Sequence, residues 1–394
     1  MKIRNITPLL LVSLLVFAGC SKPEDPKLTH EYIYYNDGRE EQVENATIDA
    51  STKNGINVSI LPNEWMGFYD DIDDYKSIRY YYRPGTENTK PKATLLDWTI
   101  TNDANEYGID LSINRDMSNP TYFAATGDKE VELKDLYAGT HYYYQIHAKY
   151  DDREVVSKRF DFNTTDFIRT LDIDRVLNAR DLGNKKTENN KQRVKQGLVY
   201  RSANLDSVTI TGRSDAIEKY GIKTDLDLRE AGQKDNPLGE PVRYINNASA
   251  LYGSPAYYSM DNGVNCVEYQ PAMRDNLKVF ANKDNVPCIF HCAVGRDRTG
   301  TLAITLYLLL GIDLDQIRQD YVVSFFSSAC NNASLETYCE SMEALLDYYY
   351  YYKSKDGTNT GTIYERVERY ALDIGVTKDE INAIRGNLLE DNKK

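Results

Sequence analysis

The ten residues His291-Cys-Ala-Val-Gly-Arg-Asp-Arg-Thr-Gly300 are the most informative stretch of this chain. The apolar run Val286-Pro-Cys-Ile-Phe290 precedes them and predicts a buried strand, and residues 301–310 are apolar enough for a buried helix. A loop between a strand and a helix N-terminus turns backbone N–H groups toward one point, and the helix dipole adds positive potential. The stretch therefore predicts an anion-binding loop in an α/β domain.

Two residues of this loop, Cys292 and Arg298, are separated by five positions and suit phosphate-ester chemistry. A thiol in such a cradle ionises more readily than a free cysteine, so Cys292 is the predicted nucleophile that becomes a phosphocysteine. The planar guanidinium of Arg298 offers donors to two phosphate oxygens and stabilises charge in the transition state. The alternative is a core cysteine and a surface arginine beside an ordinary helix start, but nothing structural requires that arrangement.

The other loop positions have predicted roles as well. Thr299 is placed so that its hydroxyl donates to the departing thiolate when water cleaves the intermediate. His291 is expected to hydrogen-bond the loop backbone rather than the substrate, and glycine at position 295 permits a turn that a Cβ would obstruct. The residues expected to bind the substrate phosphate are Ala293, Val294, Gly295 and Arg296.

The stretch resembles the phosphate-binding loop of cysteine-dependent protein tyrosine phosphatases, most closely the bacterial family whose loop reads H-C-x-x-G-K-D-R-T-G. Further stretches resemble that family's N-x-R-D-x-G-G, L-x-Y-R-S-A and D-L-R motifs: Leu177-Asn-Ala-Arg-Asp-Leu-Gly183, Leu198-Val-Tyr-Arg-Ser-Ala203 and Thr224-Asp-Leu-Asp-Leu-Arg229. The resemblance runs in order through residues 168–390 and implies an α/β tyrosine-phosphatase domain with helices on both faces of a central sheet. Two departures are Asn184, where a second glycine is usual, and Arg296, which replaces a lysine.

The resemblance implies Asp297 as the group that moves the proton, a role that contributes about 10²–10⁴-fold to such reactions. Its neighbours Arg296 and Arg298 favour the ionised carboxylate, which suits a base in the second step better than an acid in the first. Asp227 is the second candidate, either orienting Arg298 or assisting, and Asp261 is the third.

The motifs that flank the loop have two readings each. The first motif contains three polar residues that either stabilise a turn beside the site or contact the substrate: Asn178, Arg180 and Asp181. Arg201 either braces the loop or widens the positive pocket, and Arg229 resembles it in this respect.

The first residues predict an exported, lipid-anchored protein. A short basic start precedes an apolar run, residues 9–17, that is too short to span a bilayer and fits a signal peptide over residues 1–19. Phe17-Ala-Gly-Cys20 resembles a bacterial lipobox, with Phe in place of the usual Leu. We therefore expect lipidation of Cys20, a polar tether over residues 20–27, and a membrane-anchored position in the bacterial cell envelope, on the periplasmic side or the cell surface.

Residues 28–165 predict an all-β sandwich, because apolar and polar residues alternate between closely spaced turn residues and no helical stretch is convincing. Residues 131–148 resemble the L-x-P-G-T-x-Y segment of fibronectin type III domains, although Ala138 replaces the proline. In this resemblance Tyr142 is the corner tyrosine, and Tyr144, Ile146 and Ala148 share its inward face. The predicted role is a spacer, with carbohydrate or protein binding as the alternative.

Composition limits the partners. The chain has 47 Lys and Arg against 60 Asp and Glu, a net charge of −13, which opposes binding to nucleic acid. Its four histidines lie in no cluster with metal-ligand spacing, so neither a metal nor another cofactor is expected. Cys288 is expected in the core, and a disulfide between Cys330 and Cys339 is left open.

The sequence therefore predicts an enzyme that hydrolyses phosphomonoesters, most simply a protein-tyrosine phosphatase acting on a phosphorylated protein or a small phosphoester. Three alternatives stay open. In the first, the substrate is a phosphoinositide or inositol phosphate, and its second phosphate meets Arg296. In the second, the chain is an envelope interaction protein with a vestigial site. In the third, the loop belongs to a sulfurtransferase or an arsenate reductase.

Overall fold

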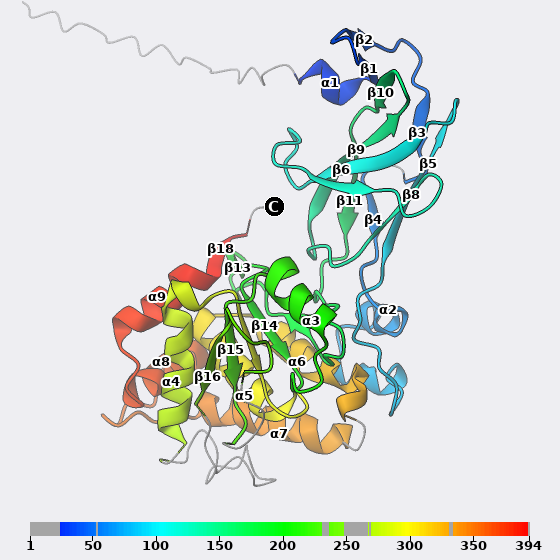
Figure 1. Cartoon of the computed structure of the whole chain (residues 1–394). Helices are drawn as coiled ribbons and strands as arrows, with labels where there is room; N and C mark the ends of the chain where they lie inside the picture. Colours follow the sequence, from blue (N-terminus) through cyan, green and yellow to red (C-terminus); the bar gives the residue numbers. More distant parts are fainter. Residues whose placement is uncertain are drawn as a thin grey trace, which may run out of the picture.

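The computed structural model describes residues 24–52, 54–230, 236–247, 267, 269–330 and 334–392. It has a β-rich N-terminal part and a C-terminal part in which helices surround a sheet (Figure 1). The predicted signal peptide, Cys20 and Asp261 lie outside the described residues. Among the residues that are described, no helix combines the length and the apolar character needed to cross a membrane.

The N-terminal part contains two sheets. The smaller sheet is antiparallel, in the order β3 (Ile48–Ala50), β5 (Thr94–Ile100), β8 (Glu130–Leu133). The larger sheet is built around β9 (His141–Lys149), which pairs with β6 (Glu106–Ser112), β10 (Arg153–Val156) and β11 (Phe160–Thr164). Its other strands are β1 (Tyr32–Tyr35), β2 (Glu40–Gln42), β4 (Ile56–Val58) and β7 (Thr121–Ala124), and the short helix α1 (Pro26–Thr29) precedes them.

Strand β9 shows why this part folds as it does. Its alternate residues Tyr142, Tyr144, Ile146 and Ala148 are all buried, as the two-residue period of a strand requires. The Tyr142 hydroxyl accepts a hydrogen bond from the backbone N–H of Tyr137 at 2.8 Å. The predicted inward face of β9 is thus confirmed.

The prediction that residues 28–165 contain no helix is wrong. Between β4 and β5 the chain forms helix α2 (Asn63–Asp70) and the 3₁₀ helix η1 (Tyr75–Tyr80). Trp65 and Phe68 are fully buried, and both rings pack on Phe326 of the C-terminal part. An eight-residue helix whose apolar side chains pack on a distant part of the chain carries little periodic signal of its own. In Figure 1, α2 lies below the two sheets and beside the C-terminal part.

The C-terminal part is built on a five-stranded sheet. Its order is β12 (Arg180–Asp181), β14 (Val199–Ser202), β17 (Cys288–His291), β15 (Thr224–Asp227), β16 (Arg243–Asn246), parallel except for β12. On β17, Ile289 joins one apolar cluster with Ala216 and Tyr220, whereas Cys288 and Phe290 join the other. The sheet is therefore covered on both faces, as predicted.

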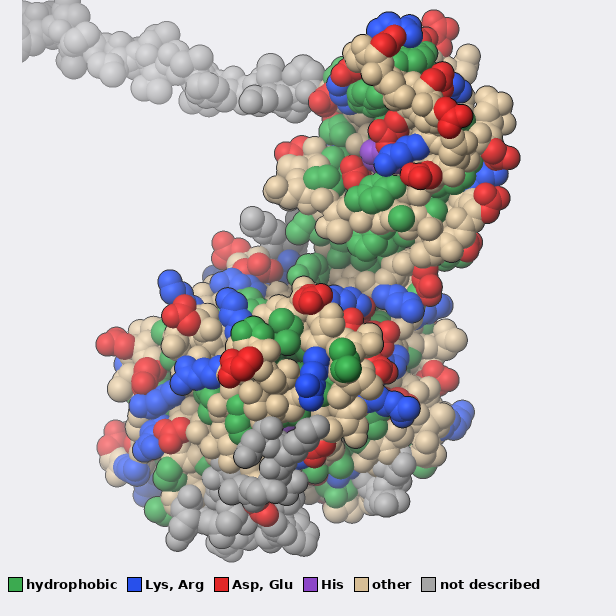
Figure 2. Space-filling view, in the orientation of Figure 1, with side chains coloured by type: hydrophobic (Ala, Val, Ile, Leu, Met, Phe, Trp, Pro, Cys, Tyr) green, Lys and Arg blue, Asp and Glu red, His purple; other side chains and the backbone are tan. Residues whose placement is uncertain are grey.

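One face carries α3 (Ile210–Ser214) and the π-helical turn η2 (Asp215–Lys219), in front in Figure 1. The helices of the other cluster are α4 (Gln270–Ala281), α5 (Asp297–Leu310), α6 (Leu314–Val322), α7 (Leu335–Tyr350), α8 (Ile363–Asp373) and α9 (Lys378–Leu388). Smaller elements are the pair β13 (Gln192–Val194) and β18 (Leu389–Asp391) and the 3₁₀ turns η5 (Lys283–Asn285), η6 (Val323–Phe326) and η7 (Ser328–Cys330). On the face shown in Figure 2, acidic and basic side chains are interspersed over both parts.

Candidate active site

Cys292 lies where the central strand of the C-terminal sheet ends. β17 runs between β14 and β15, all three parallel, and ends at His291. Helix α5 begins at Asp297, so residues 292–296 form the loop between strand and helix. The Cys292 residue is 2% exposed. This arrangement confirms the predicted strand, loop and helix, and the end of parallel strands is where α/β sheets place their ligand sites.

Three consecutive carbonyl groups of the loop are held from outside by side chains. The donors are the Asn204 amide for Ala293 (2.9 Å), the Asn178 amide for Val294 (3.0 Å) and the Arg201 guanidinium for Gly295 (2.8 Å). The carbonyl and the N–H of one planar peptide unit point in opposite directions. Holding these carbonyls outward therefore turns the following N–H groups toward the inside of the loop, where an anion would bind.

Gly295 is required by two separate features of this loop. Its φ is +73°, in the left-handed region that favours glycine. A Cβ at this position would also lie 2.4 Å from the carbonyl oxygen of Ser202, on the neighbouring strand β14. The close approach of the loop to β14 is possible only without a side chain. The positive φ agrees with the turn that the sequence predicted at Gly295.

A buried ionic cluster lies behind the loop. Asp320 of α6 is 1% exposed. Its carboxylate forms ion pairs with the guanidinium groups of Arg180 at 3.1 Å and Arg201 at 2.6 Å, and the Lys185 ammonium lies 4.0 Å from it. Burial alone would raise the pKa of Asp320, but the positive charges of Arg180, Arg201 and Lys185 lower it to about 2. Since Arg201 also holds the Gly295 carbonyl, its role is to brace the loop.

Asn178 and Asp181 also have supporting positions. Asn178 is fully buried, and its side chain joins Val294 to Arg180. Asp181 accepts hydrogen bonds from the backbone N–H groups of Gly183 and Gly197 at 2.8 and 2.7 Å. Of the two roles that the sequence left open, the structure supports stabilisation of the turn beside the site and not contact with the substrate.

Arg296 lies elsewhere than expected. Its guanidinium donates to both carboxylate oxygens of Asp297, at 3.0 and 3.2 Å, and lies over the ring of Tyr338, 3.4 Å from the centroid. The residue is 4% exposed. Burial alone would lower the pKa of Arg296, but the charge of Asp297 raises it above its usual value. The flat guanidinium stacks where an ammonium would not, so this placement does not support a contact with the substrate phosphate.

His291 is fully buried beneath the loop. Its Nε2 lies 3.0 Å from the Asp225 carboxylate, and its Nδ1 lies 3.4 Å from the Cys292 carbonyl oxygen. The ring therefore contacts the loop backbone, as predicted, and joins the loop to β15.

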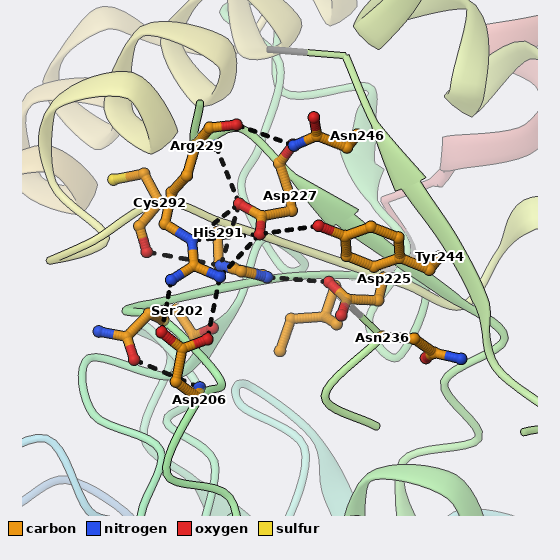
Figure 3. Close-up of polar contacts among 12 residues, drawn as sticks. Ser202, Asp206, Asp225, Asp227, Arg229, Asn236, Tyr244, Asn246, His291 and Cys292 are labelled. Carbon is orange, nitrogen blue, oxygen red and sulfur yellow. Dashed lines mark hydrogen bonds and ion pairs between the residues drawn. The ribbon is translucent and has the colours of Figure 1, made fainter. Parts of the chain in front are cut away.

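Asp227 is engaged by other side chains. Arg229 donates to its oxygens, the closest contact being 2.7 Å, and the Tyr244 hydroxyl donates at 3.1 Å (Figure 3). Burial would raise the pKa of Asp227, but the hydrogen bonds from Arg229 and the charge of His291 lower it below its usual value. An ionised carboxylate held in this way is poorly suited to donate a proton. Arg229 is bound in turn by Asp206, at 2.7 and 3.0 Å.

Thr299 lies in the first turn of α5. Among the described residues, the Thr299 hydroxyl is buried without a hydrogen-bond partner, which leaves it available for the predicted role. Cys288, Cys330 and Cys339 are free, so the disulfide left open between Cys330 and Cys339 is not formed. No group of three His, Cys, Asp or Glu side chains suited to a metal ion occurs in the described part of the chain.

The model of the tyrosine phosphatase family matches residues 171–390, more than half of the chain. The chain belongs to this family. Among curated relatives, a protein of Cupriavidus necator that carries the name of a tyrosine-protein phosphatase is 28% identical over 175 residues, 39% of this chain and 62% of the relative. A tyrosine-protein phosphatase of Nostoc commune is 28% identical over 139 residues, 32% of this chain and 47% of the relative. The chain thus matches between about half and three fifths of the length of these relatives.

Two solved structures are also similar to part of the chain. The catalytic core of Siw14 is 17% identical, with a TM-score of 0.29, and the match covers 40% of this chain and 85% of that one. The core domain of the PP-IP phosphatase SIW14 from S. cerevisiae, in complex with citrate, is 17% identical with a TM-score of 0.28 and covers 38% and 83%. TM-scores this low add no support to the family assignment of this chain.

Sequence reasoning missed several residues that support the loop of this tyrosine phosphatase family member. Asn204 directly follows the Leu198–Ala203 motif, so its position next to a family motif was an available signal. Asp320 lies on the buried face of an amphipathic helix, and aspartate is rarely buried unless it is paired with a cation. Its partners could not be identified from the sequence, because they are more than 100 residues away. Thr89, which contacts Asn178, carries no local signal at all.

Proposed function

We propose that this protein hydrolyses phosphomonoesters through a phosphocysteine intermediate and that its substrates are phosphotyrosine residues of proteins. The observation that carries the proposal is the loop after Cys292, whose three carbonyls are anchored outward at the N-terminus of α5. This leaves a bowl of N–H groups and the positive end of a helix around one buried sulfur. Membership of the tyrosine phosphatase family supports the same chemistry.

The reaction has two steps in this proposal. The Cys292 thiolate attacks phosphorus, the S–P bond forms, and the P–O bond to the leaving group breaks; the released phenolate takes up a proton from water. A second water then attacks phosphorus and passes a proton to the Asp297 carboxylate, the S–P bond breaks, and inorganic phosphate and the thiolate are released. The loop N–H groups and Arg298 stabilise the charge on the phosphoryl oxygens in both transition states. Thr299 donates its hydroxyl to the departing sulfur in the second step.

The test is a panel of phosphoesters assayed with a metal chelator present. We expect phosphate release from phosphotyrosine peptides, unaffected by chelation, and acid quenching should trap phosphate on the peptide that contains Cys292. Phosphoserine peptides, phosphoinositides and inositol phosphates form the comparison set. Turnover that disappears with chelator, or turnover without phosphate on Cys292, contradicts the proposed route.

The inositol phosphate alternative depended on Arg296 as an extra cation. Because that guanidinium is held by Asp297 and Tyr338, this alternative has lost its supporting feature. It would regain preference if the panel showed inositol phosphates to be hydrolysed faster than phosphotyrosine and if the variant Arg296→Ala lowered only that activity.

Asp297 is the residue we propose to move the proton. It is the first residue of α5, directly after the loop, and its oxygens accept hydrogen bonds from Arg296, so we assign it the role of the base that activates water in the second step. We predict that Asp297→Asn lowers kcat about 10²-fold, within the range for a lost acid–base group, and that phosphocysteine accumulates. Rapid-quench measurement of the phosphoenzyme checks this. Asp284→Asn, at an exposed position of η5, is the matched control.

If Asp297 instead acts as the acid of the first step, the phosphoenzyme will not accumulate. The loss in Asp297→Asn will then be larger for phosphotyrosine than for nitrophenyl phosphate, whose leaving group needs no proton. An unchanged kcat for phosphotyrosine would remove Asp297 from the mechanism.

We propose further that the protein is a lipoprotein of the bacterial cell envelope, anchored through Cys20. The apolar run over residues 9–17 and the small residues before Cys20 support this. Metabolic labelling with a fatty acid should mark the wild type but not Cys20→Ala, which should appear in the soluble fraction. Equal labelling of the variant would contradict the anchor.

We propose a fibronectin type III-like fold for the N-terminal part. The separate sheets β3-β5-β8 and β7-β6-β9-β11 and the corner contact of Tyr142 support it. A solved structure whose strands connect the two sheets in a different order would contradict this fold.

A further inference from the structure

A segment of the N-terminal part reaches the candidate active site. Residues 59–93 leave the sheets after β4 and return at β5, and between them they pack on the C-terminal part. The Trp65 ring stacks on Phe326 with centroids 5.2 Å apart, and the Tyr75 hydroxyl donates to Glu343 of α7 at 2.7 Å. The apolar contact is continuous with the core around α5. We call residues 59–93 the docking segment.

The end of the docking segment is bound to the chain just after α6. The backbone N–H of Asn88 donates to the Phe326 carbonyl at 2.9 Å. The Glu87 carboxylate accepts from the Ser327 hydroxyl at 3.0 Å and from the backbone N–H and hydroxyl of Ser328, each at 2.8 Å. It also accepts the hydroxyl of Thr89. Glu87 therefore organises both its own segment and residues 327–328.

Thr89 connects this arrangement to the phosphate-binding loop. Its side chain is buried, and its Oγ1 accepts a hydrogen bond from the backbone N–H of Asn178 at 3.1 Å. The Asn178 side chain donates to the Val294 carbonyl at 3.0 Å. Asn178 has a φ of +56°, which L-residues rarely adopt, so its backbone needs such support. Two hydrogen bonds through Asn178 therefore connect Thr89 to the loop.

A second route reaches the same carbonyl. Residues 328–330 form the turn η7, which begins at the serine held by Glu87. The Cys330 thiol lies 4.0 Å from the Val294 carbonyl oxygen, in hydrogen-bonding geometry for sulfur. In the described part of the chain, the Val294 carbonyl contacts Asn178, which is linked to Thr89, and Cys330, whose turn is linked to Glu87.

We propose that Thr89 and Glu87 are positioning residues for phosphate-ester hydrolysis, so that the N-terminal part completes the active site. This inference rests on the proposed function. The docking segment acts through Asn178 and Cys330 on one peptide unit of the loop, and neither Thr89 nor Glu87 is required to touch the substrate. The N-terminal part is therefore more than the spacer predicted from sequence.

The test uses the full chain with Thr89→Val, which removes the hydroxyl and retains the shape of the side chain. We expect kcat to fall roughly 10-fold, since a misplacement of about 1 Å can cost 10²-fold, with KM changed less than about twofold. Calorimetric titration with orthovanadate, which mimics the transition state, should show a parallel loss of affinity. Thr89→Ser should restore both values, because it returns the hydroxyl.

Two further variants separate positioning from folding. Thr86→Val changes an exposed threonine of the same segment and should match the wild type. Glu87→Gln keeps the size of the side chain and removes the charge that holds Ser327 and Ser328, so it should lower kcat in the same direction even if Thr89→Val does not fold. Thermal unfolding of each variant identifies those with an intact fold.

The outcomes distinguish this inference from the proposed function. If the wild type turns over phosphoesters and the folded Thr89→Val and Glu87→Gln variants keep its kcat, the inference alone is wrong. If Thr89→Ser fails to recover activity, the hydroxyl is not the positioning group and the inference is also wrong. If the wild type neither turns over phosphoesters nor binds orthovanadate, the proposed function fails and the inference falls with it.

Discussion

Replacing Cys292 with serine is expected to lower turnover at least about 10⁴-fold, because the variant lacks the group that forms the covalent intermediate. A serine hydroxyl without an adjacent base is a much weaker nucleophile than a cysteine sulfur, so the serine cannot take over the attack on phosphorus. The change is small in volume, and the carbonyl contacts of Asn178, Asn204 and Arg201 do not involve the sulfur. The variant should therefore keep its fold.

Phosphate release from nitrophenyl phosphate and from a phosphotyrosine peptide, at saturating substrate, measures the loss. Cys339→Ala is the matched control, since Cys339 is a buried, free cysteine of α7 and has no role in the proposed mechanism. It should retain turnover. Activity of Cys292→Ser within tenfold of the wild type would exclude the phosphocysteine route and leave the vestigial-site alternative in its place.

Replacing Asp320 with asparagine is expected to destabilise the protein by about 3–5 kcal/mol, the usual cost of leaving buried charges without their partner. Asp320 is the common counter-ion of Arg180 and Arg201, whose side chains are 1% and 0% exposed. Asparagine keeps the shape but cannot balance their charge. Because Arg201 also holds the Gly295 carbonyl, turnover should fall as well.

Urea unfolding at neutral pH measures this effect as an apparent free energy. The matched control is Asp315→Asn on the same helix, whose carboxylate is 79% exposed and pairs with Arg318 at the surface. Such a surface pair contributes about 0–1 kcal/mol. If both variants lose the same small amount, the buried cluster is not a stabilising element.

The same cluster predicts a dependence of stability on pH. The pKa of Asp320 is lowered to about 2 in the folded protein, and an unfolded aspartate titrates near 3.9. A lowered folded pKa means that the stabilisation is present above about pH 4 and is lost as the pH falls toward 2. The wild type should lose stability more steeply than Asp320→Asn in this window.

Much of the candidate site was predictable because its parts are contiguous in the chain. The apolar run ending at Phe290, the loop and the apolar helix after it are one stretch, so local periodicity sufficed to place Cys292 between a strand and a helix. The glycine at position 295 was equally predictable, since its backbone conformation is a local property.

The contacts between distant segments were less predictable. Arg296 was recognised as a cation beside the loop, but its direction depends on Tyr338 of α7, a ring that only the tertiary structure brings under it. Asn178 and Arg201 belong to recognisable motifs, yet whether they face the substrate or the back of the loop depends on Asp320 and Val294, far along the chain. Helix α2 was missed because the surface it packs on lies in the other part of the chain.

The sequence by itself determined the strand, loop and helix that carry Cys292, and the alternation of residues in strands of the N-terminal part. These properties follow from residue type and from short-range periodicity. Only the tertiary structure showed that the buried carboxylate of Asp320 pairs with Arg180 and Arg201 behind the loop, and that Thr89 of the N-terminal part accepts a hydrogen bond from Asn178. Hydrogen bonds and ion pairs between residues 89 to 140 positions apart leave no periodic trace in the chain, so folding had to bring them together before they could be recognised.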